Sequence, residues 1–138
     1  MPREGRSGWV RAEIASVDAI VASGTGLQEF ITDFVPGFGF VVTKVVAIVE
    51  VVGATGGATR LFRLLKGTAT IAASKTIVLA DVGTKGIQIP FTLSATPENL
   101  VYGDDDTLSI DTPAADSSSY GALTMRIIVQ GRQRPQQI

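Results

Sequence analysis

Hydrophobic residues along this chain recur at every second position more often than at the spacing of a helix, and Val, Ile, Thr and Phe supply most of them. Such alternation sends successive side chains to opposite faces of an extended strand. β-Branched and aromatic residues also fit the pleated surface of a sheet well. The pattern therefore predicts a protein built from β-strands.

The first part of the chain contains three segments with this pattern. We expect short strands over Trp9–Ile14 and Asp18–Val21, and another over Glu29–Phe34. The sequence Val35-Pro36-Gly37 predicts a turn after the third strand, because Pro fixes φ and Gly permits positive φ.

The longest apolar run extends from Phe40 to Val52 and predicts one long central strand. Its Lys44 and Glu50 share a parity that would place both on the solvent face. The segment Thr59–Lys66 is the one place where a short helix competes seriously with a strand.

Pro90 lies within an alternating segment, and because proline donates no backbone hydrogen bond it favours an edge strand or a bulge there. A Ser-rich connection from Pro113 to Tyr120 separates the last two expected strands. The strands expected in the second half of the chain are Thr68–Ala72, Thr76–Ala80, Gly86–Leu93, Thr107–Asp111 and Ala122–Gln130.

About eight short strands separated by turns rich in Gly, Pro and Asp are typical of a β-sandwich or barrel. A chain of 138 residues is the length of one domain. We therefore expect an all-β, single-domain β-sandwich over residues 9–130, flanked by an N-terminal arm over residues 1–8 and a C-terminal arm over residues 131–138.

The composition fits a folded domain, because the hydrophobic fraction is 45% and the charged fraction only 18%. Twelve basic and 13 acidic residues give a net charge of −1, so no long-range field would attract nucleic acid. The longest apolar run is too short to span a bilayer, and Arg11, Glu13 and Asp18 interrupt any signal-like stretch near the start. We expect neither nucleic acid nor membrane as a partner.

The chain contains no His and no Cys. Their absence excludes Ser-His-Asp and Cys-His catalysis, disulfides and the usual zinc sites. Carboxylates remain as the only candidates for acid-base chemistry. We therefore expect a protein that is not an enzyme and that uses no metal and no cofactor.

Gly103–Asp106 places three carboxylates side by side, which could offer oxygen ligands to Ca²⁺. The alternate spacing and distant Glu of an EF-hand are missing, so we interpret the segment as a solvated turn. Glu50 with Asp104 or Asp106 could in principle form an acid-base pair. A surface charge facing Lys44 or a cross-strand neighbour is the better interpretation of Glu50.

Two further segments have an ordinary and a functional interpretation. Gly53–Arg60 resembles a phosphate-binding loop only in its glycines, and we expect a plain loop. Phe30, Phe34, Phe38 and Phe40 surround the Pro-Gly turn, where they would either join the core or form a subunit interface; the core is the main expectation.

Both terminal arms contain arginine together with Gly, Pro or Gln and have no apolar periodicity. Arg3 and Arg6 in the first arm and Arg132 and Arg134 in the second could bind phosphates. No aromatic residues alternate with them for base stacking, so we favour salt bridges to acidic protein surfaces. We expect the arms to become ordered on contact with neighbouring subunits.

Two stretches resemble the jelly-roll decoration, or cement, proteins of tailed bacteriophage heads. Phe34–Val49 is similar to the strand pair of that group in which apolar residues, Pro and Gly precede Val-Thr-Lys-Val. Gly103–Ile110, followed by Ala122–Val129, is similar to its Gly-Asp-Thr-Leu strand and closing hairpin. The resemblance covers residues 25–130, and Leu61–Leu65 departs from it.

The resemblance implies an eight-stranded jelly roll that sits as a homodimer or homotrimer on the outer surface of a virion. It would clamp adjacent subunits of the major capsid protein and stabilise the shell through its own binding free energy. The group has no catalytic residues. We expect contacts to capsid or subunits from Arg3, Arg6, Trp9, Phe38, Arg132 and Arg134.

Two other roles stay open. The chain could be a receptor- or carbohydrate-binding jelly roll of a phage fibre or spike, or a tail or head-completion subunit. A lectin usually exposes Trp or Tyr for stacking on sugars, and this chain contains one Trp and two Tyr. That composition favours the decoration role over the lectin role.

Overall fold

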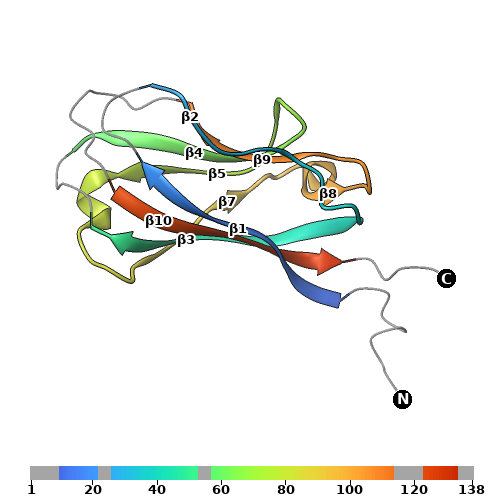
Figure 1. Ribbon diagram of the computed structural model, residues 1–138, viewed down its shortest axis with the longest axis horizontal. Helices are drawn as coiled ribbons and strands as arrows, with labels where there is room; N and C mark the ends of the chain where they lie inside the picture. The colour runs from blue at the N-terminus through green and yellow to red at the C-terminus, as the bar shows by residue number, and fades with distance from the viewer. Residues whose placement is uncertain (1–9, 22–25, 53–56, 114–122, 134–138) are drawn as a thin grey trace, which may run out of the picture.

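The computed structural model describes residues 10–21, 26–52, 57–113 and 123–133. These residues form ten strands and two short 3-10 helices, η1 (Leu79–Val82) and η2 (Pro97–Leu100). The strands make two antiparallel sheets that lie one above the other (Figure 1). The expected all-β sandwich is confirmed.

Each sheet contains five strands. Sheet A contains β1 (Val10–Val21), β10 (Leu123–Gln133), β3 (Phe40–Val51) and β6 (Gln88–Pro90) in that order, with β8 (Val101–Tyr102) also paired to β3. Sheet B contains, in order, β2 (Gln28–Phe34), β9 (Leu108–Thr112), β4 (Thr59–Lys66), β5 (Thr70–Val78) and β7 (Thr92–Leu93).

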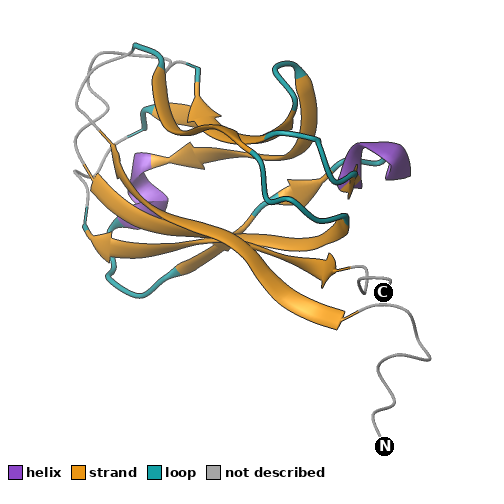
Figure 2. Ribbon diagram, turned by 45° about the vertical axis from the view of Figure 1, so that its right-hand side comes forward, coloured by secondary structure: helices purple, strands orange, loops and turns teal. Residues whose placement is uncertain are grey.

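The order of the strands is that of a jelly roll. The orders β1-β10-β3-β6 and β2-β9-β4-β5 place consecutive strands such as β1 and β2, β3 and β4, or β9 and β10 in opposite sheets. Two Greek keys folded together give this arrangement. Figure 2 shows the two layers from the side. Strands β1 and β2 form the edges of their sheets on one side of the sandwich, and the short β6 and β7 form the edges on the other.

The inner faces of the two sheets form a single hydrophobic core. Met125, Ile127 and Val129 alternate along β10 and are buried against side chains of sheet B such as Phe62 and Leu64. At one end of the core, Phe40 and Tyr102 stack with ring centroids 4.5 Å apart. Burial of these alternating positions is what the apolar pattern of the sequence specifies.

The two strands expected near the N-terminus are one strand, β1. Its pairing with β10 shifts register between Glu13 and Ala15, and Ile14 is buried at that bulge. A bulge reverses the parity of the inward positions, so the apolar pattern changes phase without any break in the strand. The expected strands Thr68–Ala72 and Thr76–Ala80 are likewise one strand, β5, followed by η1.

The segment Gly86–Leu93, in contrast, was expected to be one strand and is two strands. β6 pairs with β3 in sheet A, and β7 pairs with β5 in sheet B, so the chain crosses between sheets at the buried Phe91. Pro90 ends β6, the edge strand of sheet A, which confirms the edge position expected for it. After the two mergers described above, this division and the two-residue β8 bring the total to ten strands, compared with the expected number of about eight.

The ambiguous segment Thr59–Lys66 is a strand and not a helix. It is β4, which pairs with β5 on one side and β9 on the other. Phe62 and Leu64 point into the core, whereas Leu61 and Arg63 lie on the other parity. A position between two partner strands satisfies its backbone groups, which is why the sheet prevails over local helix propensity.

Candidate functional site

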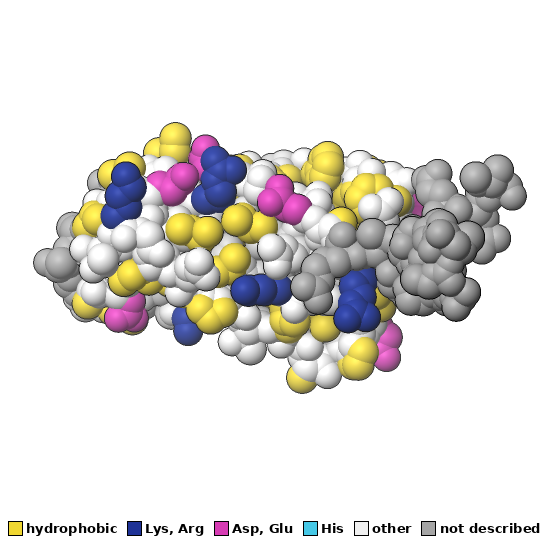
Figure 3. Space-filling view, turned by 90° about the horizontal axis from the view of Figure 1, so that it is seen from below, with side chains coloured by type: hydrophobic (Ala, Val, Ile, Leu, Met, Phe, Trp, Pro, Cys, Tyr) yellow, Lys and Arg dark blue, Asp and Glu magenta, His cyan; other side chains and the backbone are white. Residues whose placement is uncertain are grey.

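The outer face of sheet A is unusually apolar for a solvent-facing surface. Ile20 and Val51 have exposed fractions of 66% and 58%, and Val101, also on sheet A, is exposed. The register places the half-buried Ile48 and Ile128 on the same face, since Ile48 lies opposite Arg126 and Ile128 opposite Val46, which is itself buried. Antiparallel sheets usually turn a polar face to water. Figure 3 shows this face, with hydrophobic side chains between scattered charges.

Arg126 organises the charges on this face. It lies between Asp18 on β1, at 3.2 Å from its carboxylate, and Glu50 on β3, at 3.6 Å. The expectation that Glu50 faces a cross-strand neighbour is therefore confirmed. All three side chains are more than a third exposed, so the network contributes little to stability. It fixes the pattern of charge on the surface.

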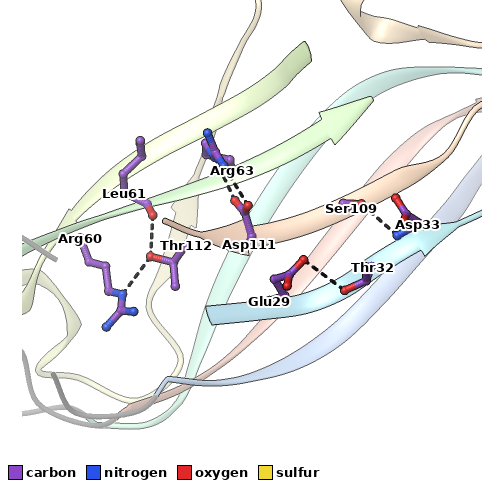
Figure 4. Close-up of polar contacts among 9 residues, drawn as sticks. All are labelled: Glu29, Thr32, Asp33, Arg60, Leu61, Arg63, Ser109, Asp111 and Thr112. Atoms are coloured by element: carbon purple, nitrogen blue, oxygen red, sulfur yellow. Dashed lines mark hydrogen bonds and ion pairs between the residues drawn. The ribbon is translucent and has the colours of Figure 1, made fainter. Parts of the chain in front are cut away.

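The outer face of sheet B has a different character, with a polar pocket of about 130 Å³. The backbone N–H of Asp33 donates to Ser109 Oγ at 3.0 Å, and Asp33 has a φ of 50°. Thr32 donates to the Glu29 carboxylate at 3.5 Å (Figure 4). The pocket is lined by Glu29, Thr32, Asp33, Leu65, Thr68, Ser109 and Asp111.

Asp111 at the wall of this pocket is held by Arg63. Arg63 Nε donates to Oδ1 at 2.9 Å, and Arg63 Nη2 donates to Oδ2 at 2.8 Å. The hydrogen bond to Asp111 raises the pKa of Arg63, with burial acting in the opposite direction. Because both carboxylate oxygens accept hydrogen bonds from the guanidinium of Arg63, Asp111 acts as a structural acceptor that joins β9 to β4.

A second arginine, Arg60, is buried at the end of the sandwich. Its Nε donates to Thr112 Oγ1 at 2.9 Å, and its Nη2 donates to the carbonyl of Gly26. Thr112 in turn donates to the carbonyl of Leu61 at 2.6 Å. The loop expected over Gly53–Arg60 is wrong for Thr59 and Arg60, which are the first residues of β4, and residues 53–56 of that segment lie outside the described residues. The contacts of Arg60 join the start of β4 to the end of β9 and to Gly26, which precedes β2.

An apolar groove of about 320 Å³ lies between the edge strands β1 and β2. Ile14, Ala15 and Ser16 line it from β1, and Ile31 and Phe34 line it from β2. Phe34 is 44% exposed there. The sandwich is therefore incompletely closed along this side.

The four phenylalanines around the Pro-Gly turn divide between core and surface. Phe30 stacks on Phe62 with centroids 6.2 Å apart, and Phe40 is fully buried. Phe38 packs against Phe40 at 5.9 Å and is partly buried. The core expectation thus holds for these three, whereas Phe34 lies at the surface in the groove between β1 and β2.

The carboxylates of Gly103–Asp106 form a turn, as expected. The N–H of Gly103 donates to Asp106 Oδ2 at 2.7 Å, and the N–H of Asp106 donates to the Gly103 carbonyl at 3.2 Å. Asp104 lies beside Gly39, just before β3 begins, whereas Glu50 lies near the other end of β3. A strand of this length separates them by roughly 30 Å, far too much for an acid-base pair. Among the described residues no group of three or more acidic residues could hold a metal ion.

Of the expected contact residues, Arg3, Arg6, Trp9 and Arg134 lie outside the described residues. Arg132 is exposed on β10, which runs on to Gln133, so Arg132 belongs to a strand and not to the expected C-terminal arm. Phe38 lies two residues before β3, at the end of the sandwich where β10 ends. The apolar outer face of sheet A was not anticipated from the sequence. The sequence feature that could have indicated it is the pair of adjacent apolar residues Ile127-Ile128. Because adjacent residues of a strand point to opposite faces of the sheet, one of the two must point away from the core.

No helix in the described part of the chain is long and apolar enough to cross a membrane. Comparison of the sequence with models of protein families finds no family that matches. Comparison with curated proteins finds no significant match either.

Proposed function

We propose that this chain is a non-catalytic structural protein that binds the outside of an assembled bacteriophage capsid and holds adjacent major capsid protein subunits together. The observation that favours this role most is the apolar outer face of sheet A. Large apolar areas exposed on a soluble domain mark surfaces that bind other macromolecules. The resemblance of Phe34–Val49 and Gly103–Ile110 to decoration proteins supports the same role.

The outer face of sheet A suits a broad protein surface better than a small ligand. Ile20, Val51 and Ile128 are aliphatic side chains on a sheet, and Arg126 supplies a fixed charge among them. Apolar contacts with charges at their margin are the usual composition of a protein interface. A part that binds only the assembled shell stabilises it by mass action, and the effect multiplies over many sites. We propose that the protein acts as a homodimer or homotrimer.

The pocket on sheet B gives less support to the alternative of a carbohydrate-binding fibre domain. Its seven lining residues include carboxylates and hydroxyls that could bind sugar hydroxyls, but none is aromatic. Aromatic rings supply the large flat contact area that sugar recognition commonly uses. A glycan array with clear hits would favour the fibre role over the capsid role.

Attachment to capsid shells tests the proposal. Ile128→Glu places a charge in the middle of the apolar face, and we expect it to weaken binding of the purified protein to undecorated shells by at least about tenfold. Thr76→Glu is the matched control, because it adds the same charge to an exposed position on sheet B. Thermal unfolding should show that both variants fold.

Copy number provides an independent readout. Quantitative mass spectrometry of particles that carry the protein should find hundreds of copies per particle. A handful of copies would support a tail, fibre or head-completion role. Equal shell binding by Ile128→Glu and the wild type would show that the outer face of sheet A is not the attachment surface.

A further inference from the structure

The edge of β1 differs from the other three sheet edges of the sandwich. β6 has three residues and ends in Pro90, and β7 has two residues. β2 has two register shifts within seven residues. β1 has 12 residues and keeps a regular register from Ala15 to Val21. Short, proline-bearing or bulged edges resist the addition of another strand, and β1 lacks these protections over that stretch.

The orientation of the backbone on this edge follows from one hydrogen bond. The Ile20 carbonyl accepts from the side chain of Gln28, so it points away from β10. In an antiparallel strand alternate residues direct both backbone groups to the same side. The N–H and C=O of Ser16 and Asp18 therefore also point to the free edge. In the described part of the chain no strand pairs with them.

The groove between β1 and β2 lies directly beside this edge. A strand added to β1 would direct every second side chain inward, toward Ile31 and Phe34 on β2. The groove volume of about 320 Å³ is sufficient for aliphatic side chains. An added strand would thus satisfy the free backbone groups and cover the exposed part of Phe34 at the same time.

The charge on this side of the molecule determines which strand would fit. Arg11, opposite Arg132 of β10, lies at the start of β1, but the following residues 12–34 contain four carboxylates and no Lys or Arg, although the whole chain has a net charge of only −1. All four, Glu13, Asp18, Glu29 and Asp33, are exposed. Arg126 neutralises only part of the charge of Asp18, because it also forms an ion pair with Glu50. A second copy of β1 would bring like charges together, which is destabilising in a cross-strand pair.

We infer that the β1 edge is a binding site for an extended segment of a partner protein that alternates apolar and basic residues. The segment adds to sheet A as a further strand, places its apolar side chains in the groove and places its Lys or Arg residues beside Asp18 and Glu13. This mode of binding obtains affinity from main-chain hydrogen bonds and specificity from alternate side chains. The inference rests on the fold and not on the proposed capsid role.

A synthetic peptide of alternating valine and lysine, about as long as Ala15–Val21, tests the site through fluorescence anisotropy with the full chain. We expect saturable binding that weakens at least about tenfold in Asp18→Lys and weakens with added salt. Asp81→Lys is the matched control, since it makes the same change of charge at an exposed residue of η1, which follows β5 of sheet B and does not belong to β1 or β2. Its affinity should match that of the wild type.

A second peptide separates strand addition from simple charge attraction. Methylation of alternate backbone nitrogens removes the main-chain donors and keeps the side chains, so this peptide should bind at least about tenfold more weakly. Ser16→Pro should have the same effect from the side of the protein, because it removes an edge N–H without touching the ladder to β10.

Three results would overturn the inference. They are no saturable binding of the first peptide, equal binding of the methylated peptide, and equal binding by Asp18→Lys and Asp81→Lys. Self-association of the wild type that Ser16→Pro abolishes would assign the edge to a second copy and would also overturn it. Failure here leaves shell attachment through the outer face of sheet A unaffected, so the two proposals fail separately.

Discussion

Arg63 on β4 and Asp111 on β9 lie directly opposite each other and join through two parallel hydrogen bonds, at 2.9 and 2.8 Å. The pair lies on the outer face of sheet B, where Asp111 has only 9% of its side chain exposed and Arg63 has 24%. A planar guanidinium that meets a carboxylate in this way fixes both position and register. The pair thus holds β4 and β9 in register with each other at this position.

Asp111→Ala should lower the free energy of unfolding by about 1–3 kcal/mol, because it removes two charge-assisted hydrogen bonds and leaves Arg63 without its carboxylate. The partial exposure of Arg63 favours the lower part of that range. Urea denaturation measures the change. Arg63→Lys, which keeps the charge but loses the paired geometry, should cost less than Asp111→Ala. A loss below about 0.5 kcal/mol for Asp111→Ala would contradict the structural role given to the pair.

Thr112 links the buried Arg60 to the carbonyl of Leu61 through a single hydroxyl. Thr112→Val keeps the shape but removes both hydrogen bonds, so we expect a loss of about 2 kcal/mol in unfolding free energy. Thr112→Ser keeps the hydroxyl and should retain most of the stability. Chemical denaturation of the two variants in parallel provides the measurement. Equal unfolding free energies for Thr112→Val and Thr112→Ser would show that the Thr112 hydroxyl does not contribute to stability.

The fold class followed from the alternation of apolar residues, because burial of one face of each strand is directly encoded at period two. What the sequence alone did not reveal was where that period changes phase. In β1 the phase changes at Ile14, and in β3 it changes near Thr43, where the pairing with β10 also shifts register. A bulge and a break between two strands leave the same local pattern. Only the partner strand distinguishes them.

The sites were less accessible to prediction than the fold, for a related reason. Glu50 was placed correctly on the surface, but its partner Arg126 is 76 residues away in sequence. The outer face of sheet A gathers Ile20, Ile48 and Ile128 from three strands. Taken singly, each of these isoleucines is an ordinary apolar residue that is next to a buried residue in the sequence. Surface patches arise from the order of strands in a sheet, which local patterns do not contain.

Tyr102 gives the protein a specific sensitivity to alkali. Burial, with a further contribution from Asp106, raises the pKa of Tyr102 well above its ordinary value, and its hydroxyl donates to the Leu65 carbonyl at 3.0 Å. The folded state therefore holds the phenol proton more tightly than the unfolded state does. Stability from this group is fully present below about pH 10, where the unfolded phenol titrates, and falls as the pH rises further.

Tyr102→Phe isolates the contribution of Tyr102 to this sensitivity to alkali. The variant should be less stable than the wild type by about 1 kcal/mol at neutral pH, because the Leu65 carbonyl loses its donor. The difference in unfolding free energy between the wild type and the variant should become smaller above about pH 10, since only the wild type has Tyr102 to titrate. Urea midpoints at neutral and alkaline pH provide the comparison. A constant difference across that range would show that Tyr102 titrates equally in both states.

Gly131 is the position where the backbones of β10 and β3 allow no side chain. A Cβ there would lie 2.4 Å from the Val41 carbonyl oxygen and 3.3 Å from Ile14. The first contact is with backbone inside a paired sheet, next to the register shift between Gln130 and Gly131, so relief requires the strands to separate. Gly131→Ala should therefore lower the free energy of unfolding by at least about 2 kcal/mol. Calorimetric unfolding would record this as a lower melting temperature.

Gly103→Ala is the matched control for that substitution. A Cβ at residue 103 would meet only Asp106 Oδ2, at the ordinary contact distance of 3.5 Å, and this glycine does not have positive φ. The control therefore adds the same methyl group without the backbone clash and should change stability by less than about 0.5 kcal/mol. If the two variants melt at the same temperature, β10 and β3 are not as close at Gly131 as this structure has them. The close approach places Ile14, at the bulge of β1, beside Gly131, so loss of Gly131 should also disturb the groove between β1 and β2.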